Sequence, residues 1–146
     1  MKFINALLAA FAFSAVSFAQ KATIAQPKNG ANVPIGGRVT IRVETDQVRF
    51  IDSPDGKVTH LGIVLDISTK SDTNQNITQI LYKGRYNPKA PNASSKQTED
   101  FTVKIPIDFK AGQAVLRSYH LAAVEVETLD NVVYDTSSVN INVVPA

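Results

Sequence analysis

The stretch RVTIRVE, residues 38–44, decides the fold class, because charged or polar side chains alternate strictly with aliphatic ones. Val39, Ile41 and Val43 share one face of an extended chain, and the polar residues share the other. A period of two predicts a β-strand with one buried face and one face in water.

The same alternation recurs farther along the chain. Between residues 60 and 67 it predicts two faces: Leu61, Ile63, Leu65 and Ile67 on one, and His60, Gly62, Val64 and Asp66 on the other. Phe101, Val103 and Ile105 alternate in the same way, and Pro106 limits how far that strand can pair. The remaining strands are expected at 23–25, 77–82, 113–128 with a bulge near Ala122-Ala123, 132–134 and 139–143.

Turns and loops separate these segments. Gly, Pro, Asn or Asp mark turns at 27–30, 52–56 and 110–112, and Asp130-Asn131 suits a tight hairpin turn. Polar stretches without a period predict longer loops at 68–76 and 86–96, and residues 33–37 are expected to run irregularly along an edge. The pattern predicts an all-β fold, an immunoglobulin- or fibronectin-like antiparallel β-sandwich of about seven to eight strands, with a small barrel as the alternative.

The first nineteen residues have the layout of a secretory signal peptide. Lys2 gives a positive start, residues 6–16 are almost entirely apolar, and Ser17 and Ala19 place small residues before a cleavage site at Gln20. The apolar run is too short to span a bilayer. We therefore expect residues 1–19 to be a signal peptide, residues 20–146 to be a single domain, and the protein to be secreted without a membrane span.

Composition excludes several function classes. Lys and Arg number 15 and Asp and Glu 13, so without Lys2 the net charge is 14 − 13 = +1, which gives no support to binding of nucleic acid or an anionic membrane. The chain has no Cys, which rules out a disulfide framework, a thiol nucleophile and a cysteine zinc site. It also has no Trp, the strongest platform for stacking on a sugar.

The two histidines are the first candidates for chemistry. His60 and His120 both fall in strand-like runs, and across a sheet they could hold a metal together with Asp66, Asp52 or Glu125. No pair of ligands is closely spaced in the sequence, so we favour two ordinary strand histidines and expect no metal and no cofactor.

Carboxylates offer a second route to catalysis, since glycoside hydrolysis needs two of them facing a sugar. Glu125 and Glu127 lie close together on one strand face, but their apolar neighbours are typical of an ordinary half-exposed strand. No serine lies in a Gly-x-Ser-x-Gly elbow, and no helix follows Gly36-Gly37 to form a phosphate site. We expect no enzyme. The acids considered for such a pair are Glu44, Asp66, Glu99, Asp100, Glu125 and Glu127.

The loop that begins near residue 83 is the best candidate for a contact surface, because loops on a rigid sandwich commonly carry recognition and Arg and Tyr dominate binding hot spots. The alternative is a solvated basic loop whose prolines only shape the backbone. Asn76 and Asn92 begin N-glycosylation sequons in or beside these loops. The candidate binding residues are Tyr82, Lys83, Arg85, Tyr86, Asn87, Pro88 and Lys89.

Several blocks of the sequence, in order over nearly the whole of residues 20–146, resemble the necrosis-inducing secreted protein family of small fungal effectors. The blocks are IAQPKNG at 24–30 with Val33 and Gly36, ILYKGRYNP at 80–88, FTVKIP at 101–106, AGQAVL at 111–116, HLA at 120–122 and ETL at 127–129. The chain departs from the family in having no cysteine and in residues 130–138.

This resemblance implies a non-catalytic protein that dampens plant pattern-triggered immunity by binding immune receptor-associated kinases. A host protein, such as a plant receptor-like kinase, is then the expected partner. The opening Pro-x-Asn-Gly pattern before an alternating strand also resembles the immunoglobulin-like domain of fungal wall-assembly proteins. That second resemblance implies a module that binds cell-wall polysaccharide.

Overall fold

The computed structural model describes residues 21–46, 56–70, 79–92, 96–126 and 129–146. These residues form eight strands and no helix, and none of them lies in a helix long and apolar enough to cross a membrane. The signal peptide expected at residues 1–19 lies outside this part of the chain. The strands are β1 (Ala22–Gln26), β2 (Ala31–Pro34), β3 (Arg38–Thr45), β4 (Lys57–Thr69), β5 (Gln79–Gly84), β6 (Gln97–Lys104), β7 (Gly112–Val126) and β8 (Leu129–Val144).

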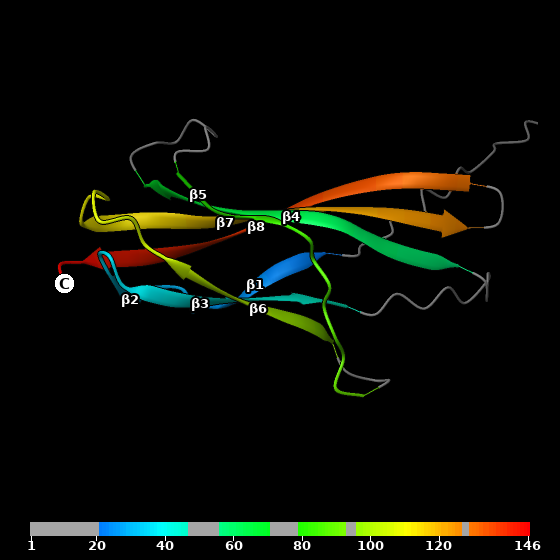
Figure 1. Ribbon diagram of the computed structural model, residues 1–146, viewed down its shortest axis with the longest axis horizontal. Helices are drawn as coiled ribbons and strands as arrows, with labels where there is room; N and C mark the ends of the chain where they lie inside the picture. Colours follow the sequence, from blue (N-terminus) through cyan, green and yellow to red (C-terminus); the bar gives the residue numbers. More distant parts are fainter. Residues whose placement is uncertain (1–20, 47–55, 71–78, 93–95, 127–128) are drawn as a thin grey trace, which may run out of the picture.

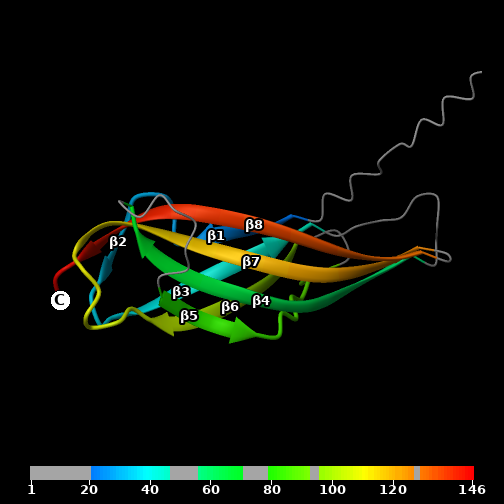
Figure 2. The same ribbon diagram turned by 90° about the horizontal axis from the view of Figure 1, so that it is seen from above.

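The strands form two sheets, which confirms the all-β sandwich. One sheet has the order β1-β3-β6 and the other the order β2-β8-β7-β4-β5. Figure 2 shows β8, β7 and β4 side by side, with the three-stranded sheet behind them. Every pairing is antiparallel except β2 with β8, which is parallel. Residues 31–34 therefore pair in register along the edge, and this includes Val33 and Pro34, the first two residues of the stretch 33–37 for which an irregular course was expected.

The strands β4, β7 and β8 are the longest and continue past the ends of β3 and β6 (Figure 1). The expected turn at Asp130-Asn131 is wrong, and the strands expected at 132–134 and 139–143 are one continuous strand. Strand β8 already begins at Leu129, and Asp130 and Asn131 pair with Glu125 and Val124. The β7–β8 ladder has no shift in register along its whole length, so hydrogen bonding overrides the turn preference of Asp and Asn.

One irregularity in β4 changes which side chains face the interior. The register with β7 shifts between His60 and Gly62, so Leu61 is the extra residue of a β-bulge. The bulge was expected on the opposite strand, near Ala122. Its effect is to place Leu61 on the outside, 47% exposed, although the alternation had assigned it to the buried face. His60 takes the inward position instead.

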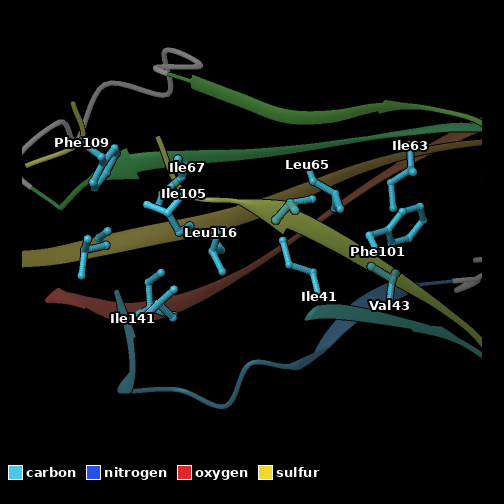
Figure 3. Packing of buried hydrophobic residues seen from close by; sticks show 14 of the residues in the cluster. Ile41, Val43, Ile63, Leu65, Ile67, Phe101, Ile105, Phe109, Leu116 and Ile141 are labelled. Atoms are coloured by element: carbon cyan, nitrogen blue, oxygen red, sulfur yellow. The ribbon is translucent and has the colours of Figure 1, made fainter. Parts of the chain in front are cut away.

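The core lies between the two sheets, where aliphatic side chains from both layers point toward one another (Figure 3). Ile41 and Val43 of β3 are fully buried, as the opening stretch predicts, and they face Ile63 and Leu65 of β4. Burial of apolar surface on this scale, at about 25 cal/mol per Å², stabilises the domain without any disulfide. The outer face of the five-stranded sheet has no described strand packed on it.

Candidate functional site

The outer face of the five-stranded sheet contains an open, mainly apolar hollow of about 360 Å³. It lies at the bulge in β4, where Gly62 supplies no side chain to fill it. A Cβ atom at Gly62 would lie 3.1 Å from the carbonyl oxygen of Gly84, so the floor is closely packed. The residues that line the hollow are Leu61, Gly62, Ile63, Val64, Gly84, Tyr119, His120, Leu121 and Tyr134.

Large side chains remain exposed around this hollow. Leu61, Leu121 and Tyr134 are 47%, 40% and 63% exposed. The ring of Tyr134 lies nearly parallel to that of Tyr119, with 6.5 Å between their centroids and 21° between their planes. Partial burial is the main reason that the pKa of Tyr119 is raised, and the nearby Asp66 carboxylate adds to the effect. The two rings present an apolar surface with hydroxyl groups at its edge.

A buried ion pair lies next to the hollow on the same face. Asp66 is fully buried on β4, and its Oδ1 accepts a hydrogen bond from Arg117 Nε of β7 at 3.0 Å. Burial raises the pKa of the Asp66 carboxyl, and the Arg117 guanidinium opposes that rise. The pair neutralises both charges, so it adds no net charge to the surface beside the hollow.

Beneath the hollow, on the inner face, two histidines and an aspartate form a hydrogen-bonded chain. His60 Nδ1 lies 2.9 Å from His120 Nε2, and His120 Nδ1 lies 2.8 Å from Asp135 Oδ2. The ring of Tyr86 meets both imidazoles edge-on, at centroid distances of 5.0 and 5.1 Å. The His120 side chain is fully buried, and Asp135 Oδ1 accepts a hydrogen bond from the Ala22 amide of β1. The chain therefore links the two sheets.

The sequence hypothesis of a histidine metal site is only half met. His60 and His120 do come together, but the structure brings neither Asp66 nor Glu125 to them. Asp66 lies on the outer face with Arg117, and Glu125 is exposed and pairs with Lys57 along the ladder. Asp52 lies outside the described residues. In the described ranges no group of three His, Asp or Glu side chains is arranged to hold a metal ion.

Asp135 is the member of the chain that sequence reasoning missed. It lies directly opposite His120 in the β7–β8 ladder and therefore on the same face. The signal that could have found it is the alternation from Val139 and Ile141 back through β8, which places residue 135 on the inner face. The expected strands at 132–134 and 139–143 hid that signal, because residue 135 fell in the gap between them.

The candidate binding loop, residues 82–89, crosses from the edge of one sheet to the other, and part of it is core. Tyr86 is 2% exposed and Pro88 is buried, so neither is available for contact. Tyr82 packs on Phe101, with 4.7 Å between ring centroids, and its hydroxyl donates to the carbonyl of Arg85. Burial raises the pKa of Tyr86 to about 12.

The other four candidate binding residues, Lys83, Arg85, Asn87 and Lys89, are exposed. The Asn87 amide donates to Glu99 Oε2 at 2.5 Å, and Lys89 pairs with Thr98 of β6. Lys83 and Arg85 flank Gly84, which lines the hollow, and Lys83 pairs with Val64, another lining residue. Two cations of the predicted loop are thus chain neighbours of a residue that lines the hollow, a surface that the sequence had not indicated.

The remaining sequence candidates do not assemble into a site. Asp100 forms a bidentate ion pair with Arg42, both of whose hydrogen bonds are 2.7 Å long. This pair holds the pKa of the Asp100 carboxyl below its usual range. Asn92 is exposed, and Asn76 lies outside the described residues, as does Glu127. Use of the two sequons stays a prediction.

Comparison with known proteins gives little further information. No protein-family model matches the chain, and no curated protein matches it. Among solved structures, the seventh ScaB type I cohesin from Pseudobacteroides cellulosolvens is similar, with 12% sequence identity, 86% of this chain and 92% of that chain covered, and a TM-score of 0.38. A likeness at this level supports no argument about function, so the sandwich assignment rests on the strand pairings themselves.

Proposed function

We propose that the protein is a secreted, non-catalytic binding protein that docks on another protein through the hollow on its outer face. The single observation that carries this proposal is an apolar hollow rimmed by exposed large side chains on a sheet face that no described strand covers. Exposed apolar patches of this kind mark interaction sites. Tyr134 and Leu61 supply the contact area, and Tyr is among the residues enriched in binding hot spots.

The rim of the hollow indicates what the partner surface should look like. Lys83 and Arg85 add two exposed positive charges beside Gly84, whereas Asp66 and Arg117 cancel each other. A partner with an apolar centre and acidic groups at its edge fits this arrangement, because charge complementarity directs orientation and speeds association.

The resemblance to fungal effectors supplies the more specific form of the proposal. In that form the partner is a plant immune receptor-associated kinase, and the protein acts by covering a surface that the kinase needs for signalling. This mechanism requires no bond-making chemistry. It agrees with the described residues, in which the acids are paired or dispersed and the histidines are hydrogen-bonded in the interior.

A wall polysaccharide is the second candidate, and one specific observation favours it. The nearly parallel rings of Tyr119 and Tyr134 resemble a stacking platform for sugars, and exposed hydroxyl and amide side chains continue along β8 at Thr136, Ser138 and Asn140. Such a surface would bind a neutral glycan through ring stacking and hydrogen bonds.

Binding measurements can separate the two candidates. The purified protein would be tested against purified receptor-like kinase domains and, in parallel, against insoluble β-glucan and chitin. We expect saturable kinase binding that Tyr134→Ser weakens by at least about tenfold, while Ile107→Ser, at an apolar position that is 78% exposed and away from the hollow, leaves it unchanged. Retention on polysaccharide without kinase binding would transfer the function to the second candidate. No binding to either would contradict the proposal.

A further inference from the structure

The hydrogen-bonded histidine pair limits how many protons the folded protein can accept. His120 Nδ1 donates to Asp135, so His120 Nε2 is the acceptor of the hydrogen bond from His60 Nδ1. One added proton on either imidazole leaves both bonds intact, because the N–H between the two rings can then belong to either of them. With a second added proton both facing nitrogens would carry hydrogen, and two N–H groups would lie head to head across a distance of 2.9 Å.

The groups that face the pair from the neighbouring strands cannot relieve that conflict. Asp135 of β8 is already the acceptor for His120, and Tyr86 meets both rings edge-on. Gln97 of β6 forms a hydrogen bond with His60 but carries no charge. Two more carboxylates raise the pKa of Tyr86 by their negative charge. Glu44 of β3 is paired with Lys96, and Glu99 of β6 accepts a hydrogen bond from the Asn87 amide.

The same residues join the two sheets. Asp135 Oδ1 accepts from the Ala22 amide of β1 at 3.2 Å, and two positions further on Ser137 Oγ accepts from the Ile24 amide. Tyr86 Oη donates toward the Val43 carbonyl of β3 at 3.4 Å. Separation of the imidazoles would therefore strain contacts to both β1 and β3. It would also move the floor of the hollow, since His120 lines it.

We propose that the His60–His120 pair is a proton-operated latch between the sheets, which holds with at most one added proton and opens with the second. Acidification then weakens the contacts between the sheets around His60 and His120, while the aliphatic core stays packed. A partner bound at the hollow would then be released on acidification. Only this consequence rests on the proposed function.

The direction of the pKa shift agrees with the latch. Burial, and secondly the positive charge of His120, lower the pKa of His60 below its ordinary value of 6.5. In the unfolded chain both histidines take up protons near that value, so the folded state binds fewer protons. Stability is therefore complete above about pH 6.5 and falls as the pH drops, by about tenfold in the unfolding equilibrium constant per pH unit for each proton excluded.

The latch can be tested by proton titration of the imidazoles, followed by NMR. The chain has only two histidines, so their side-chain signals are readily distinguished. We expect the folded protein to take up one proton at most between about pH 7.5 and the onset of acid unfolding, with faster amide exchange at Ala22 and Ile24 as the onset is approached. Independent titration of both imidazoles near the ordinary value, with unchanged exchange, would overturn the proposal.

A variant gives a second readout. His60→Gln keeps a hydrogen-bonding side chain but cannot be charged, so the unfolding equilibrium constant should change less steeply below about pH 6.5, by about tenfold per pH unit. Thr136→Ala, on the outer face of β8, is the matched control and should keep the wild-type slope. If His60→Gln shows the wild-type acid profile, the latch is refuted. If this variant fails to fold, the titration of the wild-type protein still decides, and neither test needs a binding partner.

Discussion

The two faces of the five-stranded sheet come from the same strands, but one packs in the core and the other is open to solvent. On the inner face Ile63, Leu65 and Leu116 are almost completely buried against the other sheet. On the outer face Leu61, Leu121 and Tyr134 remain exposed around the hollow. Apolar character alone therefore does not assign a side chain to the core. The register of its strand determines which face a side chain lies on, and in β4 the bulge at Leu61 changes that face.

The largest effect is expected on the inner face. Leu116→Ala removes a fully buried side chain in the middle of β7 and leaves a cavity, so it should lower the free energy of unfolding by about 3 kcal/mol. Urea denaturation measures the loss, and Ile107→Ala at an exposed apolar position should change it little. A loss below about 1 kcal/mol for Leu116→Ala would mean that the two faces are not distinct.

The next effect tests the buried ion pair on the outer face. Arg117→Ala leaves the Asp66 carboxylate buried without its cation, which should cost about 2 kcal/mol at neutral pH. Burial raises the pKa of Asp66 above its ordinary value of 3.8, and Arg117 opposes that rise, so loss of Arg117 raises the pKa further. The folded variant then takes up a proton at Asp66 more readily than the unfolded chain does. The difference from wild type should therefore shrink as the pH is lowered.

A control separates this ion pair from an exposed one. Arg42 and Asp100 form a bidentate pair on the surface of the three-stranded sheet, where water and salt screen the charges. Arg42→Ala should leave stability essentially unchanged over the same pH series. If both arginine variants lose equal stability without pH dependence, burial of Asp66 has no energetic consequence and this part of the comparison fails.

A smaller effect is expected where the crossover segment meets the histidines. Tyr86→Phe keeps the ring against His60 and His120 but removes long contacts from Oη to the Val43 carbonyl and Thr45 Oγ1, at 3.4 and 3.5 Å. The cost should be about 1 kcal/mol or less. In the wild-type protein an ultraviolet titration should show one of the four tyrosines ionising near pH 12, and that signal should vanish in the variant. If the signal near pH 12 remains in the variant, a tyrosine other than Tyr86 gives rise to it.

The sequence predicts most of this fold, because sheet alternation is a local pattern. Residues 38–44 and 101–105 lie on the faces that their alternation indicates, and the eight strands of the described residues agree with the expected seven to eight. The position of the bulge at Leu61 could not be predicted from the sequence. It depends on how β4 pairs with a strand about sixty residues away, and no local residue preference specifies that register.

The candidate site was less predictable than the fold. Its parts come from three separate stretches, around Leu61, Leu121 and Tyr134, and only the β4–β7–β8 register brings them together. In the loop chosen from its Arg, Lys and Tyr residues, Lys83 and Arg85 are exposed on either side of Gly84, a lining residue, while Tyr86 and Pro88 are buried. Residue type indicated that the loop matters, but burial, a tertiary property, divides its residues between packing and contact.

Binding through the outer face of the five-stranded sheet can be tested by hydroxyl-radical footprinting of the protein with and without the partner found in the binding measurements, since the probe oxidises exposed side chains. We expect protection of Leu61, Leu121 and Tyr134, with Ile107 modified at the same rate in both samples. Unchanged oxidation of those three side chains in a saturated complex, with protection on the three-stranded sheet instead, would contradict it.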